Sequence, residues 1–135
     1  MLSCRVVGSK EVLDRYEKMQ KSIPPLIYKT MLRACLEVSR TTKKDYLTGP
    51  RPRKLAVGKT GWLRSSVNVL IKKKIKEIIG VIGARPWYGK MWETRPQGTF
   101  KDGSPKQRPF LGPALEQSRA KIRQIFDRAG AELVK

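Results

Sequence analysis

The sequence predicts an α+β fold in which a small antiparallel sheet packs against a long N-terminal helical segment and a C-terminal helix. Apolar residues recur at helical spacing in both terminal thirds, whereas residues 66–71 alternate as a strand does and begin a β-hairpin predicted to return over residues 77–84. The chain has 135 residues, 39% of them hydrophobic, which is enough for one domain with a modest core. We therefore expect a single domain over residues 1–135, with two long loops between its elements.

The N-terminal third predicts a short strand over residues 2–7 and then two helices. In the first helix, over residues 10–21, apolar side chains recur three and four positions apart. Pro24 and Pro25 should end that helix, because a proline disfavours the α conformation of the residue before it. The second helix should run from about Pro25 to Tyr46, with an apolar stripe of Ile27, Met31, Ala34, Cys35 and Val38.

A hairpin should follow a first long loop, over residues 47–61. Residues 66–71 alternate as a strand does, and the lysine-rich residues 72–76 predict the turn. Residues 77–84 then return as the second strand. Residues 87–93 fit either a helical turn or a third strand.

A second long loop, over residues 94–109, separates the hairpin from the last helix. It contains three prolines and two glycines and has no apolar period. The last helix should begin with Pro113 at its first position, where the missing N–H costs nothing. One face of it should carry Leu115, Ser118, Ile122, Ile125, Phe126 and Ala129.

The chain is strongly basic, with 30 Lys and Arg against 11 Asp and Glu and a net charge of +19. Such a surface should face something acidic. The basic residues cluster over residues 49–61 and at Lys72, Lys73, Lys74 and Lys76. The lysine run is equally typical of a solvated hairpin end and of a contact with an acidic partner. The charge also allows sequence-independent nucleic-acid binding, although no known recognition motif is present.

Several classes of site are excluded by composition. The chain has no histidine, so histidine acid–base chemistry and histidine-ligated metal sites are absent. Its two cysteines, Cys4 and Cys35, are too few for a four-thiolate zinc site. They could form one disulfide, but we expect both to stay reduced in a cytoplasm and Cys35 to be packed and unreactive. No run approaches 18 apolar residues, so we expect no membrane-spanning segment.

Three further features invite an enzymatic interpretation, and each fails. Residues 56–61 contain Gly-Lys-Thr, but Arg53 stands where a P-loop needs its first glycine. Ser65 and Ser66 lack a nucleophile elbow and a histidine. Glu93 lies among aromatic residues and could be a catalytic acid. Because no partner base accompanies it, we favour a structural carboxylate held by a nearby arginine. We expect no enzymatic activity and no cofactor or metal.

Three short motifs occur in order along the chain: TGWLRSSV at 60–67, WYGKMWE at 87–93 and RPFLGPALEQ at 108–117. Together they resemble the head–tail joining, or tail-completion, proteins of long-tailed bacteriophages. That family has a Thr-Gly-x-Leu-Arg-x-Ser segment before a hairpin, a Tyr-x-x-x-x-Glu segment after it, and a Pro-Phe-Leu-x-Pro-Ala-Leu helix start. The matching positions are Thr60, Gly61, Leu63, Arg64, Ser66, Tyr88, Glu93, Pro109, Phe110, Leu111, Pro113, Ala114 and Leu115.

One departure from the family lies directly after Glu93. The family follows this glutamate with an aromatic residue and Gly-Thr, whereas this chain has Thr94, Arg95 and Pro96. We therefore expect the beginning of the 94–109 loop to be built differently.

The resemblance implies a non-enzymatic virion protein of the tail or neck, made in the host cytoplasm. It would form a ring, commonly of six subunits, between the head-side connector or adaptor and the tail tube or tail terminator. A ring around passing DNA would suit a basic surface. The loops 47–61 and 94–109 would then act as assembly arms. Their partner-contact residues would be Arg51, Arg53, Lys54, Lys59, Arg95, Phe100, Lys101 and Lys106, and Lys72, Lys73, Lys74 and Lys76 would lie near DNA.

The matching residues also have expected structural roles. Gly61 should permit an unusual backbone turn into the strand. The two matching prolines, Pro109 and Pro113, should stiffen the approach to the last helix. The apolar residues Phe110, Leu111 and Leu115 should anchor that helix on the sheet. The alternative function is a sequence-independent nucleic-acid-binding module.

Overall fold

The protein is described by a computed structural model over residues 9–48, 61–75, 77–101, 103 and 106–134. It is an α+β fold, as predicted. The predicted strand over residues 2–7 and most of the first long loop lie outside the described residues. The elements are α1 (Ser9–Thr41), the π-helix η1 (Thr42–Tyr46), α2 (Trp62–Ser66), β1 (Val67–Lys73), β2 (Ile78–Ala84), α3 (Trp87–Thr94) and α4 (Leu111–Val134).

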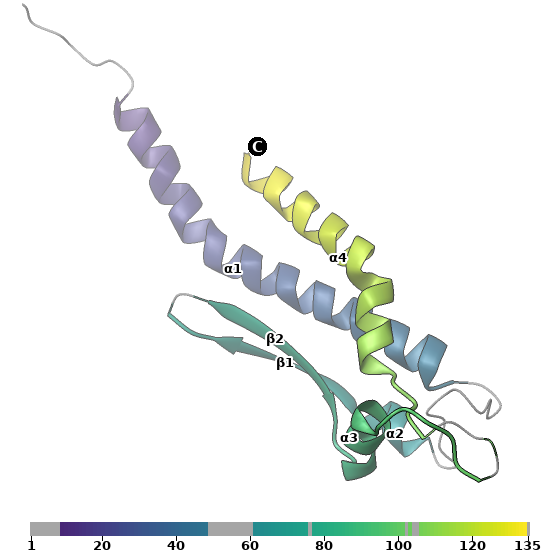
Figure 1. Cartoon of the computed structure of the whole chain (residues 1–135). Coiled ribbons are helices and arrows are strands. Elements are labelled where there is room, and N and C mark those ends of the chain that lie inside the picture. Colours follow the sequence, from purple (N-terminus) through teal and green to yellow (C-terminus); the bar gives the residue numbers. More distant parts are fainter. Residues whose placement is uncertain (1–8, 49–60, 76, 102, 104–105, 135) are drawn as a thin grey trace, which may run out of the picture.

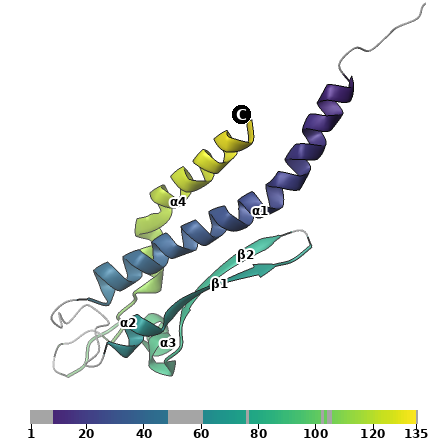
Figure 2. The same cartoon turned by 180° about the vertical axis from the view of Figure 1, so that it is seen from behind.

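The N-terminal helical segment is one continuous helix, so the prediction of two helices was wrong. Helix α1 passes through Pro24 and Pro25 and bends in this part of its length (Figures 1 and 2). Each proline lacks the N–H that would bond the carbonyl four residues earlier. The residues that carry those carbonyls, Gln20 and Lys21, are exposed, so water can replace the lost bonds. The helical run ends at Tyr46, as expected.

Helix α1 lies between α4 and the hairpin (Figure 1). Ala34, Cys35 and Val38 of its predicted stripe are buried. On β2, a Cβ atom at Gly80 would lie 2.3 Å from Cys35 Sγ, so the glycine is what allows the strand to approach the helix this closely. Burial raises the pKa of the Cys35 thiol, which disfavours the reactive thiolate. The prediction that Cys35 is packed is confirmed.

The hairpin is a two-stranded antiparallel sheet. Its register runs from Val67 opposite Ala84 to Lys73 opposite Ile78. The first strand therefore includes two of the lysines that were predicted to form the turn over residues 72–76. For residues 87–93 we expected either a helical turn or a third strand, and they form a helix, α3.

A short helix, α2, precedes β1 where a direct turn into the strand was expected. Gly61 is its N-cap residue and has φ +68°, in the left-handed region that glycine adopts without strain. The unusual backbone conformation predicted for Gly61 is therefore confirmed, but it leads into a helix. Val67 then turns to an extended conformation and begins β1.

Helix α4 begins at Leu111, so Pro113 occupies its third position and not its first. Both positions lie in the first turn, where the backbone N–H groups have no partner within the helix. The buried residues of α4 are Ala114 and Ser118. Leu115 is 48% exposed, so its predicted anchoring role was wrong. Ser118 lies against α1, where its hydroxyl donates to Thr41 Oγ1 at 3.1 Å, and its small side chain allows the two helices to approach closely.

Candidate assembly surface

The three sequence motifs meet at one end of the molecule, around Phe110. This residue, 1% exposed, forms a buried cluster with Leu47, Leu63 and Val67. Around the cluster pack Tyr46, Ile82, Ala84, Tyr88, Trp92 and Leu111. Helices α2 and α3 and the beginning of α4 accordingly lie at the same end (Figure 1). The predicted anchoring by Phe110 and Leu111 is confirmed.

Glu93 holds the N-terminus of α4. Its Oε2 accepts the backbone N–H groups of Phe110 at 2.9 Å and Leu111 at 3.2 Å, and its Oε1 accepts that of Gly112 at 2.7 Å. These N–H groups have no partner within the helix, and a negative charge is favoured at this end of its dipole. Glu93 is therefore structural, but backbone amides hold it and not the arginine that we predicted.

The loop over residues 94–109 returns to α3 at its end. The Arg108 N–H donates to the Trp92 carbonyl at 2.9 Å, and Gln107 Nε2 donates to the Glu93 carbonyl at 2.9 Å. Within the loop, the Lys106 N–H donates to the Gly98 carbonyl at 2.9 Å. These bonds fix the two ends of the loop side by side, next to the Glu93 cap.

Cations of this loop lie over aromatic rings. The guanidinium of Arg95 is 5.9 Å from the ring centroid of Trp92 and 5.5 Å from that of Phe100. Arg108 lies 4.6 Å from the Trp92 centroid on α3, and Lys106 lies 6.0 Å from that of Phe100. Such contacts orient a cation while leaving its charge available. Three predicted contact residues, Arg95, Phe100 and Lys106, are thus brought together.

Two tryptophans beside this network are largely exposed. Trp62 is 55% exposed and Trp87 is 74% exposed. Each makes an edge-to-face contact with Tyr88, at ring-centroid distances of 5.9 and 6.1 Å. We missed Trp62 and Trp87 as site residues, because Trp62 lies 26 positions before Tyr88 in the sequence and meets it only once α2 packs beside α3.

The charged side chains at this end of the molecule are mostly basic. Between residues 61 and 110, the described acidic residues are Glu77, at the far end of the hairpin, and Glu93, which is engaged with α4. We call this surface the aromatic–basic end. The ring and cation contacts join eight of its residues: Trp62, Trp87, Tyr88, Trp92, Arg95, Phe100, Lys106 and Arg108. We include the exposed basic residues of α2, α3 and the segments that adjoin α3 in sequence: Arg64, Arg85, Lys90 and Lys101.

The remaining predicted contact residues lie elsewhere. Lys72, Lys73 and Lys74 are exposed at the opposite end of the hairpin. Lys73 Nζ lies 4.5 Å from the ring centroid of Tyr28, and Lys74 Nζ pairs with Glu77 Oε1 at 2.7 Å. Arg51, Arg53, Lys54, Lys59 and Lys76 lie outside the described residues.

The described residues hold no group of three or more Cys, Asp and Glu that could bind a metal. No helix in the described part of the chain is long and apolar enough to span a membrane. The hydroxyls of Ser65 and Ser66 donate to the carbonyls of Trp62 and Leu63, at 3.0 and 2.8 Å.

Comparisons with protein families, with curated proteins and with solved structures found no match to this chain.

Proposed function

We propose that this chain is a structural protein of a phage neck, which joins the tail to the head-side connector. The observation that carries the proposal is the meeting of the three motifs in space. Leu63, Tyr88 and Phe110 come from different motifs and belong to one packed cluster, and Glu93 of the second motif caps the helix that the third begins. Three motifs that are far apart in sequence therefore belong to one structural unit.

The aromatic–basic end supports the proposal, because its composition is that of a protein-binding surface. Tryptophan, tyrosine and arginine supply most of the binding energy at protein interfaces. The cation–π contacts of Arg95 and Arg108 hold these side chains in place before binding, which lowers the entropic cost of association. The partner should present an acidic surface with apolar sites for Trp62 and Trp87.

In the neck, copies of this chain would form a ring, with six subunits as the resemblance implies. The ring would contact the head-side connector or adaptor on one side and the tail tube or terminator on the other. Each chain has 30 basic and 11 acidic residues. This positive charge would suit a position beside packaged DNA, whose phosphates attract cations.

Phage particles that lack this protein provide the test. We expect electron microscopy of such lysates to show filled heads and separate tails, and a plasmid copy of the wild-type chain to restore joined particles. Heads and tails that join and remain infectious without the protein would overturn the proposal.

The end of the hairpin favours a second candidate, sequence-independent binding of duplex nucleic acid. Lys72, Lys73 and Lys74 are exposed there, although Lys74 is partly neutralised by Glu77. Titration with duplex DNA at low and near-physiological salt tests it. Binding that persists at near-physiological salt and is lost in Lys72→Gln/Lys74→Gln would favour this function. Binding at low salt alone would show charge without a dedicated site.

A further inference from the structure

The two outer edges of the hairpin differ in composition. In the described part of the chain the sheet has two strands, so each strand has one side that pairs with no other strand. Strand β1 ends in lysines, at Lys72 and Lys73, which discourage pairing between edge strands. Strand β2 has the sequence IIGVIGA, without a charge or a proline, and its register on β1 contains no bulge. The edge of β2 therefore lacks the usual protection of an exposed strand.

The register shows which backbone groups of β2 face this edge. The Lys74 N–H donates to the Glu77 carbonyl at 2.8 Å, and hydrogen-bonded pairs alternate with non-hydrogen-bonded pairs along an antiparallel ladder. Val81 and its alternate neighbours therefore bond to β1. The residues between them direct their N–H and C=O groups outward, and these groups have no partner among the described residues: Ile78, Gly80, Ile82 and Ala84.

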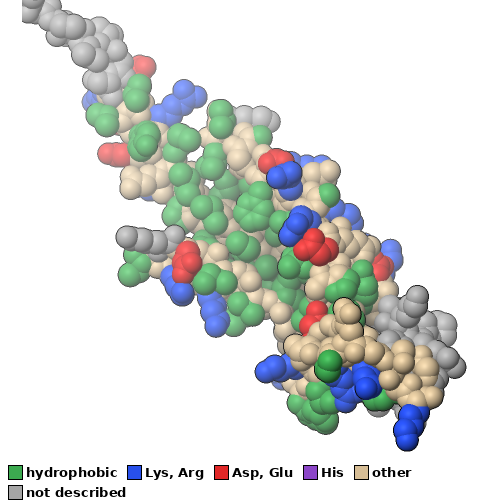
Figure 3. Space-filling view, in the orientation of Figure 1, with side chains coloured by type: hydrophobic (Ala, Val, Ile, Leu, Met, Phe, Trp, Pro, Cys, Tyr) green, Lys and Arg blue, Asp and Glu red, His purple; other side chains and the backbone are tan. Residues whose placement is uncertain are grey.

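The face of the hairpin that points away from α1 is also apolar. Gly80 lies against Cys35 of α1, so its neighbour Val81 points to the opposite face and is 40% exposed. Leu70, the residue opposite Val81 on β1, is 55% exposed. Figure 3 shows hydrophobic side chains over the hairpin, with charged side chains at its free end. A sheet of two strands is marginal by itself, so further strands would stabilise it.

The residues that flank β2 carry opposite charges. Glu77 directly precedes the strand and Arg85 directly follows it, and both are exposed. Each lies four positions from Val81. When two β2 strands run antiparallel with Val81 at the centre, Glu77 of each copy is therefore opposite Arg85 of the other. The same register places outward-directed backbone groups opposite one another. A shift by one residue would lose those hydrogen bonds, and a shift by two would separate the charges.

We propose that two copies of this chain pair through the edges of their β2 strands, which makes one four-stranded antiparallel sheet with two-fold symmetry. The backbone groups of β2 gain partners, Val81 packs against Val81 of the second copy, and two Glu77–Arg85 pairs form. Pairing of β2 with β1 of a second copy is disfavoured by the lysines of β1. The pair forms in the free protein, and the inference does not depend on the proposed neck function.

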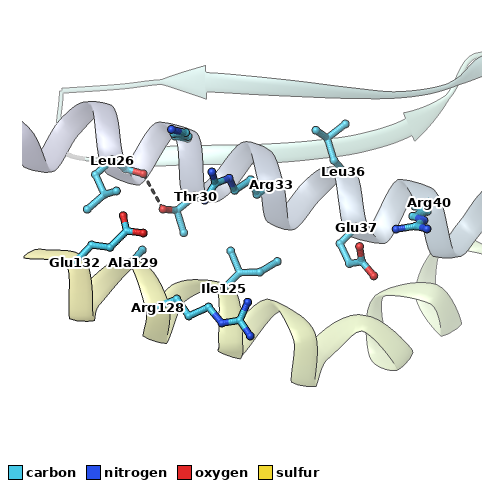
Figure 4. A pocket seen from close by; sticks show the side chains of 11 residues that line it. Leu26, Thr30, Arg33, Leu36, Glu37, Arg40, Ile125, Arg128, Ala129 and Glu132 are labelled. Atoms are coloured by element: carbon cyan, nitrogen blue, oxygen red, sulfur yellow. Dashed lines mark hydrogen bonds between the residues drawn. The ribbon is translucent and has the colours of Figure 1, made fainter.

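The arrangement of the helices leaves room for this contact. Helix α1 packs on both strands, and its width of about 10 Å matches that of two strands about 4.8 Å apart. The two α1 helices can thus lie side by side on one face of the four-stranded sheet. Helix α4 lies on the other side of α1 from the strands, where side chains such as Thr30 and Ile125 face each other (Figure 4).

Reversal of the flanking charges tests the register. Glu77→Arg places two arginines opposite each other at both ends of the contact, and Arg85→Glu places two glutamates there. Each single variant should dimerise about tenfold more weakly than wild type. The double variant Glu77→Arg/Arg85→Glu restores both pairs and should dimerise like wild type. Sedimentation velocity over a concentration series measures all four proteins. Loss of the exposed ion pair between Glu77 and Lys74 costs the fold little.

A cysteine at the two-fold axis tests the same contact independently. Val81 and its copy form a non-hydrogen-bonded pair with Cα atoms about 4.5 Å apart, which a disulfide can span. In a Cys4→Ser background, Val81→Cys should form an interchain disulfide under mild oxidation. The matched control is Leu70→Cys, on the same face of β1, which should not cross-link. Disulfides that form only when the two variants are mixed would show β2 paired with β1 and overturn the proposal.

Three other results would also overturn it: a wild-type chain that stays monomeric throughout, a double variant as weak as the single variants, or Val81→Cys that does not cross-link. Circular dichroism should show all variants folded, because the substituted residues of β2 and its flanks are exposed. Because the measurements need no phage, their failure leaves the neck function to be judged separately.

Discussion

At the scale of single residues, the Glu93 carboxylate ties α3 to the N-terminus of α4. It accepts three backbone N–H groups from residues 17 to 19 positions away. Glu93→Gln removes the negative charge and turns an NH₂ group toward these donors. We expect the free energy of unfolding to fall by about 1–2 kcal/mol, as measured by urea denaturation.

Glu116→Gln is the matched control for this substitution. Glu116 also lies on α4, but it is exposed and pairs only with Arg119, at 3.1 Å. Its loss should change stability by less than about 0.5 kcal/mol. Equal destabilisation in the two variants would contradict the capping role of Glu93.

Gly80 is the second residue on which packing depends. In Gly80→Ala the new methyl group would meet Cys35 Sγ at 2.3 Å and Met31 Sδ at 3.1 Å. We expect a loss of about 1–3 kcal/mol from overpacking, again measured with urea. Gly83→Ala on the same strand has nothing within 4 Å of its Cβ position and should be nearly neutral.

Cys35→Ala combined with Gly80→Ala checks the cause of this effect. Removal of Sγ makes room for the new methyl group, so the double variant should lose less than the two single losses added together. Strict additivity would mean that the sulfur atom is not the obstacle.

At the scale of elements, α1 consists of two parts that differ in how far neighbouring elements cover them. Residues 30–41 are covered by α4 and the hairpin, whereas residues 9–21 stand clear of both (Figures 1 and 2). In dilute protein, amide hydrogens of residues 9–21 should exchange much faster than those of residues 30–41. Hydrogen exchange followed by mass spectrometry measures both. Equal protection in a dilute monomer would contradict this division of the helix.

Local rules succeeded for the hairpin and α4, left α3 undecided between a helix and a strand, and failed for α1 and α2. The hairpin and α4 were predictable, because alternation and helical spacing are properties of neighbouring residues. Pro24 and Pro25 were expected to end a helix, since each removes one hydrogen bond. The packing of residues after Pro25 on α4 and β2 stabilises the segment. Water can replace the hydrogen bonds lost at the exposed prolines, and the bend of α1 relieves the clash of each proline ring with the carbonyl four residues earlier.

At the scale of the whole molecule, the two candidate surfaces lie at opposite ends of the hairpin. The aromatic–basic end lies beside α2 and α3, and the lysines of the hairpin lie at the opposite end (Figure 1). In phage complementation, Trp87→Ala/Lys90→Glu should lower the yield of joined particles by about tenfold. The isolated protein should remain folded, because Trp87 is 74% exposed.

The control for this variant is Leu115→Ala/Arg123→Glu, which makes the same kinds of change on exposed positions of α4. It should join heads and tails as wild type does, when particles are counted by electron microscopy. A comparable loss in both variants would show that the aromatic–basic end has no special part in assembly.

The sequence alone determined the α+β class, the hairpin, the C-terminal helix and the basic charge, because periodicity and composition need no knowledge of distant contacts. Only the tertiary structure decided that Glu93 caps α4, that α1 continues through its prolines and that Trp62 adjoins Tyr88. Each of these depends on segments brought together by packing around Phe110 or along α1. Contacts of that kind leave no spacing pattern in the chain.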